Sequence, residues 1–298
     1  AATDALGTVQ TSEKAIAEQL ASAKRNFEVG TATITDTREA QARFDLVQAQ
    51  EIAAENDLRV KKLALDTVTG KADAQPLTLA TPARLPALAP EEINAWVQQA
   101  EDASPGITQA RLALDVARLE TEKAKAGHKP TLDLTASRNV TSNINGTTST
   151  GLSGKTHLTQ LGVTFNLPLF AGFSTQNRIR ETLSLEEKAQ ADLDKARRDV
   201  SQATRSAFFG VVSGSGQVRA LEAAEASSQS ALDANRLGYQ VGVRINIDVL
   251  NSQSQLFDTK AKLAKARYDV LVGGLKLRQA AGTLKADDLQ PINALLTP

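Results

Sequence analysis

The sequence predicts a mainly α-helical protein with a small β part, built from long antiparallel coiled-coil helices and one β-hairpin. Proline placement predicts the helices: none of the nine prolines lies in 1–75 or 169–290, and proline breaks the interior of a helix. The second stretch also carries an apolar residue at every seventh position. Between the two stretches, two segments alternate in character, as half-buried strands do.

The first stretch, 1–73, is expected to hold a pair of helices joined by a turn. Good helix formers such as Ala, Leu, Glu and Lys dominate it. Val29-Gly30 supplies the turn, because glycine tolerates the positive φ at which many helices end. No capping signal precedes Glu13, so the chain is expected to open inside a helix and to be N-terminally truncated.

Two shorter segments follow this helix pair. The segment 74–104 is expected to be irregular through its Pro-, Leu- and Ala-rich part and to end in a short helix near 91–102. The segment 105–129 is expected to be one helix, because only its first residue is a proline.

The segment 130–170 is expected to form a β-hairpin. Residues 131–137 and 161–167 alternate, and 141–157 between them is a polar tract that predicts a long loop. About ten alternating residues is also the length of a tilted membrane-crossing strand. On this pattern alone a soluble hairpin and a membrane hairpin are equally supported.

The segment 171–285 is expected to hold the longest helices, with a turn near 238–248, and 286–298 forms a C-terminal tail. Gly214-Ser215-Gly216 is expected to interrupt or kink the first helix. A seven-residue apolar repeat in the second predicts a left-handed coiled-coil seam, with an ordinary amphipathic bundle helix as the alternative. The repeat consists of Val249, Leu256, Leu263, Val270, Leu277 and Leu284.

An internal repeat relates the two helical regions. A shift of 212 residues places Gly30 over Gly242 and Asp36 over Asp248. A repeat predicts two similar helix–turn–helix units. If the repeat is complete, an earlier hairpin is expected to precede residue 1.

Several classes of chemistry have no support in the sequence. Lys plus Arg and Asp plus Glu both number 34, whereas nucleic-acid binders usually have a basic excess. There is no cysteine, and the two histidines, His128 and His157, have no acidic cluster beside them. Nothing assembles a nucleophile, a base and an oxyanion site. No enzyme, no cofactor and no resident metal are expected.

Several motifs in order resemble the TolC-type outer-membrane efflux and secretion channels, the outer membrane factor family. The resemblance covers about residues 14–296. It rests on GYQVGVRINIDVL at 238–250, GHKPTLDLTA at 127–136, FNLPLFAG at 165–172, ARYDVL at 266–271 with AGTL at 281–284, and RNFEVG at 25–30 with ITD at 34–36.

This resemblance implies a homotrimer in the outer membrane of Gram-negative bacteria, in contact with its lipid. Each family subunit is an α-barrel protomer that gives four strands to a shared transmembrane β-barrel, whereas this chain has one strand pair. The long helices continue as a tunnel across the periplasm. The tip turns, here at Gly30 and Gly242, meet a periplasmic adaptor (membrane fusion) protein and an inner-membrane pump. No nucleic-acid partner is implied.

The resemblance also assigns a gate. The family's closed tip is held by hydrogen bonds and ion pairs whose members match Thr35, Asp36, Tyr239 and Arg244. A Tyr hydroxyl and a guanidinium can both donate to one carboxylate, so these residue types suit the role. The alternative is a set of surface residues near turns.

Asp248 matches a ring of aspartates at the family's pore constriction, where polyvalent cations can bind and block. The family's well-known member has a second aspartate three residues later, and Asn251 stands there in this chain. A ring of three carboxylates instead of six is expected to give weaker cation selectivity and weaker metal block.

The function that follows is a trimeric outer-membrane and periplasmic channel with a periplasmic tip gate. It would export drugs or secreted proteins in a tripartite efflux or type I secretion system. The rival is a periplasmic coiled-coil adaptor or structural scaffold without a pore. An adaptor normally carries compact β modules such as a lipoyl-like domain, and no such segment appears in the sequence.

Overall fold

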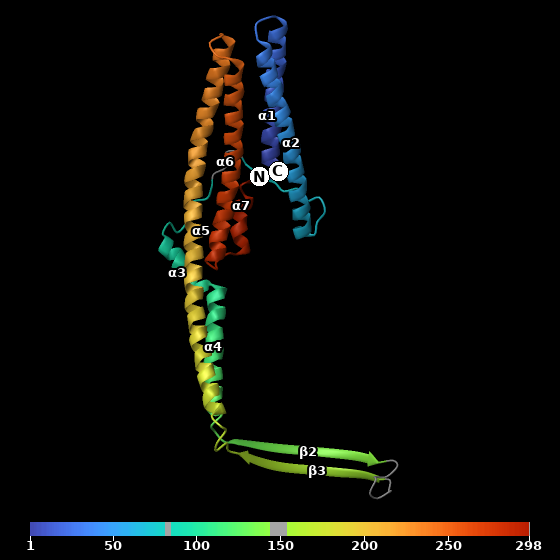
Figure 1. Ribbon diagram of the computed structural model, residues 1–298, viewed down its shortest axis with the longest axis vertical. Coiled ribbons are helices and arrows are strands. Elements are labelled where there is room, and N and C mark those ends of the chain that lie inside the picture. The colour runs from blue at the N-terminus through green and yellow to red at the C-terminus, as the bar shows by residue number, and fades with distance from the viewer. Residues whose placement is uncertain (81–84, 144–153, 298) are drawn as a thin grey trace. The chain divides into compact units, whose positions relative to one another are not determined.

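The computed structural model describes residues 1–80, 85–143 and 154–297, and it confirms the mainly α-helical fold (Figure 1). The chain divides into two compact units: unit 1 holds Ala1–Ser104 and Val200–Pro298, and unit 2 holds Pro105–Asp199. The elements are α1 (Ala2–Glu28), α2 (Ile34–Thr69), β1 (Thr78–Leu79), α3 (Ile93–Ala103), α4 (Pro105–Ala126), β2 (Thr131–Asn143), β3 (Gly154–Asn166), α5 (Ser174–Gln240), α6 (Asn246–Ala280), the 3-10 helix η1 (Ala286–Leu289), α7 (Gln290–Asn293) and β4 (Leu296–Thr297).

The α6 helix carries the predicted apolar seam. Five of the six seam positions, from Val249 to Leu277, are buried. The sixth, Leu284, is 44% exposed because α6 ends at Ala280. Within unit 1 the seam packs against the end of α5, where Val218 meets Leu263 and Val270. Burial at seven-residue intervals is the packing of a coiled-coil seam.

A second layer of unit 1 brings α1 and α2 against α6. Leu20 and Ala23 of α1, Ala40 of α2 and Leu250 of α6 form one buried cluster. The two alanines let the helix backbones approach closely, because each adds only a methyl group to the interface. The two helical hairpins of unit 1 are therefore packed together near their turns.

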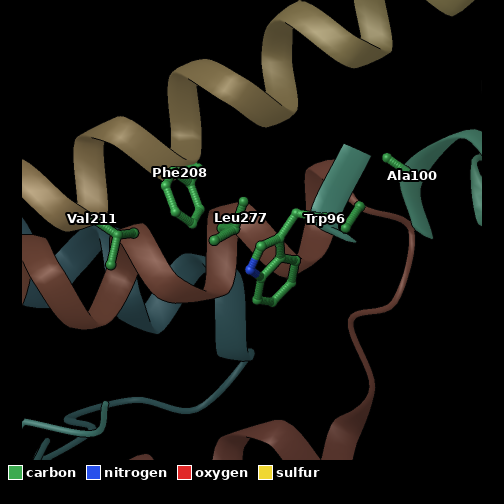
Figure 2. Close-up of a cluster of buried hydrophobic side chains, with 6 residues drawn as sticks. Trp96, Ala100, Phe208, Val211 and Leu277 are labelled. Atoms are coloured by element: carbon green, nitrogen blue, oxygen red, sulfur yellow. The ribbon is translucent and has the colours of Figure 1, made fainter. Parts of the chain in front are cut away.

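Trp96 of α3 lies in a buried hydrophobic cluster of unit 1. Its ring packs with Phe208 of α5 and Leu277 of α6 in one cluster (Figure 2). The indole nitrogen Nε1 donates to the Pro90 carbonyl at 2.8 Å, so the single tryptophan leaves no buried donor unpaired. This cluster ties α3 to both long helices.

One small sheet lies inside segments that were expected to be irregular. β1 pairs antiparallel with β4, with Thr78 opposite Thr297 and Leu79 opposite Leu296. Two residues per strand are too few to produce a visible alternation in the sequence. The pair joins segment 74–104 to the C-terminal tail.

Of the two expectations for Gly214-Ser215-Gly216, the interruption is wrong, because α5 is continuous from Ser174 to Gln240, and the kink stays a prediction. Packing explains the glycine. A Cβ atom at Gly214 would lie 2.9 Å from Cγ2 of Val270 on α6. Glycine is present here to admit a neighbouring side chain rather than to break the helix.

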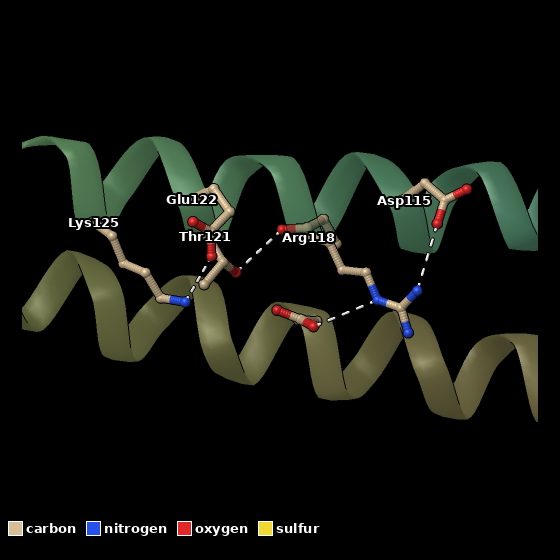
Figure 3. Close-up of polar contacts among 7 residues, drawn as sticks. Asp115, Arg118, Thr121, Glu122 and Lys125 are labelled. Atoms are coloured by element: carbon tan, nitrogen blue, oxygen red, sulfur yellow. Dashed lines mark hydrogen bonds and ion pairs between the residues drawn. The ribbon is translucent and has the colours of Figure 1, made fainter.

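Unit 2 pairs α4 with the beginning of α5. Ile107, Leu114 and Thr121 of α4 are buried at seven-residue intervals, and Thr182 and Leu193 of α5 are buried too. Exposed ion pairs border this seam (Figure 3): Arg118 lies 3.6 Å from Asp115 on its own helix and 3.7 Å from Glu186 of α5.

The hairpin of unit 2 is longer than predicted. β2 and β3 pair antiparallel over their whole length, from Thr131 opposite Asn166 to Asn143 opposite Gly154. The predicted loop 141–157 therefore holds strand residues at both ends, and its part 144–153 lies outside the described residues. Thr, Ser and His are compatible with a strand whose side chains are exposed, so polarity alone misplaced the boundary. Among the described residues, no helix is both long enough and apolar enough to cross a membrane.

Candidate functional site

The two helix tips of unit 1 have the same backbone. Gly30 has φ +79° and Gly242 has φ +78°. The hydrogen bonds around them correspond one for one: Val29 N to Arg25 O and Val241 N to Leu237 O are both 3.1 Å. Further pairs link Thr31 N to Asn26 O and Val243 N to Gly238 O, both at 2.8 Å. Each turn is a helix end with a left-handed glycine, a common way to terminate a helix.

The first tip is stabilised by a capping box at the start of α2. The Thr33 hydroxyl accepts from Asp36 N at 3.2 Å, and Asp36 Oδ2 accepts from Thr33 N at 2.9 Å. The same Oδ2 also accepts from the Thr33 hydroxyl at 2.7 Å. Asp36 thus caps its own helix, and no hydrogen bond to its other oxygen, Oδ1, occurs among the residues that the structure describes.

The second tip lacks this cap because Ile245 occupies the capping position. The equivalent aspartate, Asp248, instead lies 3.6 Å from Arg244. Gly238 makes room for that arginine, since a Cβ atom there would lie 2.6 Å from Arg244 Cγ. Two aspartates at equivalent positions of the repeat therefore have different partners.

Tyr239 joins the two hairpins. Its hydroxyl accepts from Asn26 Nδ2 of α1 at 3.2 Å. Its ring packs on the buried cluster of Leu232, Val249 and Leu256. Thr35 is exposed in the first turn of α2.

The structure places the four predicted gate residues at the two tips and joins none of them to another by a hydrogen bond within the described chain. The tip turns Gly30 and Gly242 lie where the repeat predicts them. A contact of Tyr239 or Arg244 with Asp36, the core of the predicted gate, stays a prediction.

Asn246 is a tip residue that the sequence reading missed. It is fully buried, accepts a hydrogen bond from the Gln19 amide of α1 and donates to the Asp36 carbonyl of α2 at 3.4 Å. It thereby links the start of α6 to both helices of the first hairpin. The available signal was a difference between the repeats, because Ile34 stands at the equivalent position.

The two predicted constriction residues lie one helical turn apart on α6. Asp248 is partly exposed beside Arg244. Asn251 is exposed, and its Oδ1 accepts from a guanidinium nitrogen of Arg43 on α2 at 2.8 Å. Arg43 is a second residue that the sequence reading missed, since it is distant in sequence and belongs to no motif.

The β2–β3 hairpin has two unlike faces over residues 132–137 and 160–165, whereas further along Arg138 and Lys155 interrupt the apolar face and Leu158 lies on the opposite one. Alternation and register place Leu132, Leu134 and Ala136 of β2 beside Phe165, Val163 and Leu161 of β3. The opposite face pairs Asp133 with Thr164, Thr135 with Gly162 and Ser137 with Gln160. Among the residues that the structure describes in unit 2, none covers this apolar face: Leu134 is 78% exposed and Val163 is 69% exposed.

Two contacts away from the tips also bear on how α1 is held. Burial raises the pKa of Tyr268 to about 12, and the hydrogen bond to Asp4 of α1 adds to the effect. A side-chain hydrogen bond with Glu51 of α2 raises the pKa of Glu13 of α1, with partial desolvation and the Glu51 charge as lesser causes. The hydrogen bond between Tyr268 and Asp4 links α6 to α1. The contact between Glu13 and Glu51 instead brings together two carboxyl groups that repel each other when both are ionised.

The described residues contain no group of three or more His, Cys, Asp or Glu side chains arranged to hold a metal ion. His128 and His157 are both exposed. His157 was expected in a loop, but it lies in β3 opposite Val140.

Repeated helical hairpins with matched tips, together with one antiparallel strand pair, match the α-barrel protomer that the resemblance to the outer membrane factor family implies. The comparisons with known proteins agree. The family described as "Outer membrane efflux protein" matches residues 1–71 and 96–283, and the chain belongs to this family. The family and several of its members are named for the outer membrane, which is where the chain is placed by this membership.

The individual relatives are similar over nearly the whole chain. "Outer membrane protein TolC" of Escherichia coli K12 is 33% identical in an alignment of length 303, which covers 99% of this chain and 61% of the relative. "Alkaline protease secretion protein AprF" of Pseudomonas aeruginosa is 32% identical over 98% of this chain and 61% of the relative. The chain thus spans about three fifths of the length of these relatives.

Solved structures share the fold. The outer membrane protein VceC of Vibrio cholerae superposes with a TM-score of 0.78 at 17% identity, over 94% of this chain and 66% of that one.

Proposed function

We propose that three copies of this protein form an export conduit through the outer membrane and the periplasm. The conduit would carry drugs or secreted proteins that a partner pump drives, in a tripartite efflux or type I secretion system. A periplasmic adaptor protein and an inner-membrane pump would be the partners. The protein's own role would be passage and gating, without catalysis.

The two faces of the hairpin carry this proposal. A strand pair with one apolar and one polar face suits a boundary between lipid and water, which is the position of a strand in a transmembrane barrel. A soluble hairpin with this pattern would have to bury its apolar face against its own chain. Leu134 and Val163 remain exposed instead.

The names of the relatives support both kinds of cargo. AprF is named for secretion of an alkaline protease, and the family is named for efflux. Neither name selects a cargo for this chain.

The proposed gate lies at the tips. Asp36 Oδ1 can accept from Tyr239 or Arg244 while Oδ2 keeps the capping box, so the same carboxylate can serve the helix and the gate. Thr35 would contribute its exposed hydroxyl. Asp248 and Asn251 would line the constriction, where a polyvalent cation could bind. Such exposed bonds are weak enough to break when the gate opens.

Single-channel recording of the full-length protein in planar bilayers tests this proposal. Discrete pores whose ion preference shifts with Asp248→Ala would support both the conduit and the constriction. Asp269→Ala is the matched control, because it removes an exposed carboxylate from the same helix far from the tip. Pores indifferent to Asp248→Ala would remove the constriction assignment and keep the conduit. Folded, inserted trimers without conductance would favour the scaffold.

A further inference from the structure

We propose that Arg43 determines the ion selectivity of this pore by placing an uncompensated positive charge beside the constriction. The inference rests on the proposed function, because it needs Asp248 and Asn251 to line the pore. It adds a residue from α2 to a constriction that the resemblance assigns to α6 alone.

The position of Arg43 is held by its neighbours. Ala40 of α2 and Leu250 of α6 belong to the buried cluster that joins α2 to α6, and the partly buried Phe44 packs against it. Arg43 and Asn251 each directly adjoin one of these residues in sequence, so their side chains leave the edge of the same interface. The hydrogen bond of 2.8 Å between them spans that edge.

The positive charge of Arg43 is not neutralised by a carboxylate. Within the described residues no Asp or Glu oxygen lies within 4.0 Å of its guanidinium, although closer ion pairs occur elsewhere in the chain. Asp45 is close in sequence, but its Oδ1 accepts from Gln41 at 2.8 Å. A guanidinium stays charged at any physiological pH, and the neutral Asn251 amide orients it without cancelling that charge.

The carboxylate of Asp248 attracts cations less strongly than an unpaired aspartate would, because Arg244 lies 3.6 Å from it. Arg244 and Asp248 offset each other's charge within each chain, which leaves the charge of Arg43 beside Asn251. Threefold repetition at a narrow point would multiply the positive excess, and charge rings set which ions pass. The constriction should favour anions, or discriminate far less against them than aspartates alone would.

Reversal potentials in a KCl gradient test this inference on the full-length protein. Arg43→Gln should raise the potassium-to-chloride permeability ratio by roughly threefold to tenfold. Arg43→Lys keeps the charge and should keep the wild-type ratio. Arg59→Gln is the matched control, since Arg59 lies on the same helix and pairs with Glu55.

Asn251→Asp distinguishes this inference from the hypothesis that selectivity depends only on the number of aspartates at the constriction. The new carboxylate would pair with Arg43, so the single variant should change the ratio little. Combined with Arg43→Gln, the same substitution should give the largest cation preference of the set and the strongest block by a trivalent cation.

The outcomes that overturn the inference are distinct from failure of the conduit. Pores whose ratio responds to Asp248→Ala but not to Arg43→Gln would refute the role of Arg43 alone. A full effect of Asn251→Asp in the presence of Arg43 would refute the pairing. Inserted trimers without any conductance would refute the proposed function, and the inference would fall with it.

Discussion

Equivalent residues at the helix ends of the two repeats make different contacts. Asp36 and Asp248 are equivalent in sequence, but Asp36 completes a capping box with Thr33 and Asp248 pairs with Arg244. The difference comes from one position, where Thr33 offers a hydroxyl and Ile245 does not. Asn246 adds a buried polar link that has no counterpart in the other repeat.

Thr33→Ala and Thr35→Ala should separate the cap from the gate. Loss of the Thr33 hydroxyl should lower the free energy of unfolding by about 1 kcal/mol, because a helix N-terminus loses its side-chain acceptor. Thr35→Ala should change stability by less than about 0.5 kcal/mol, as for most surface substitutions. In channel recordings Thr35→Ala should raise the open fraction if it belongs to the gate. Wild-type gating in that variant would exclude Thr35.

Gly70 and Gly282 offer a matched test of backbone strain against crowding. Both have a positive φ, +67° and +69°, but space is open around Gly70, whereas a Cβ atom at Gly282 would lie 2.7 Å from the Ala103 carbonyl oxygen. Gly70→Ala should cost about 1 kcal/mol from the backbone alone. Gly282→Ala should cost at least about 1 kcal/mol more. Urea unfolding measures the loss of stability in both variants. Equal losses would show that the end of α3 moves away from the added methyl group without cost.

Among the elements, α6 organises unit 1. Its seam packs on α5, and its start packs on α1 and α2. The contact between α1 and α2 includes a pair of like charges, because Glu13 and Glu51 face each other across it. Two carboxylates in contact repel when both are ionised, so this hairpin contains a pH-dependent weak point.

Glu51→Gln should stabilise the α1–α2 pair at neutral pH. The folded state raises the pKa of Glu13, so its stabilising effect is full below the unfolded value of about 4.3 and is lost as pH rises through the folded value. The variant should therefore show a smaller loss of stability between acidic and neutral pH. Urea unfolding across this range measures the effect, with Glu39→Gln on the same helix as control. Identical pH profiles for wild type and variant would contradict the coupling.

At the scale of the whole molecule, the exposed apolar face of the hairpin determines which environment suits this protein. This face is not covered by the described residues of unit 2. Lipid is the covering that fits an exposed apolar face whose reverse side is polar. Membership in the outer membrane efflux protein family agrees with that environment.

Val163→Lys and Thr164→Lys test the two faces with adjacent residues. Val163 lies opposite Leu134 on the apolar face, so a lysine there should cost about 2–4 kcal/mol in lipid and greatly reduce assembled trimer in the outer membrane. Thr164 lies opposite Asp133, so a lysine there gains an opposite charge and should assemble normally. Trimer yield in membrane fractions measures both variants. Equal tolerance would argue against a lipid-facing hairpin.

The helical architecture could be predicted because its signals are visible along the sequence itself. Long proline-free stretches mark where helices can form, the α6 seam marks a buried face, and the repeat around Gly30 and Gly242 holds down to individual backbone hydrogen bonds. The two strands of the hairpin were also predictable, although its polar sequence hid their full length. The roles given to the tip and constriction residues came from resemblance and stay predictions.

The remaining features depend on residues that meet only in the folded chain. The β1–β4 pair, the Arg43–Asn251 bond and the link from Asn246 to Gln19 each join segments far apart in sequence. Gly214 was misinterpreted for the same reason, since its purpose is the space that Val270 occupies. Periodicity indicates which face of an element is buried. Tertiary packing determines the partner on that face, and with it the charge at the proposed constriction.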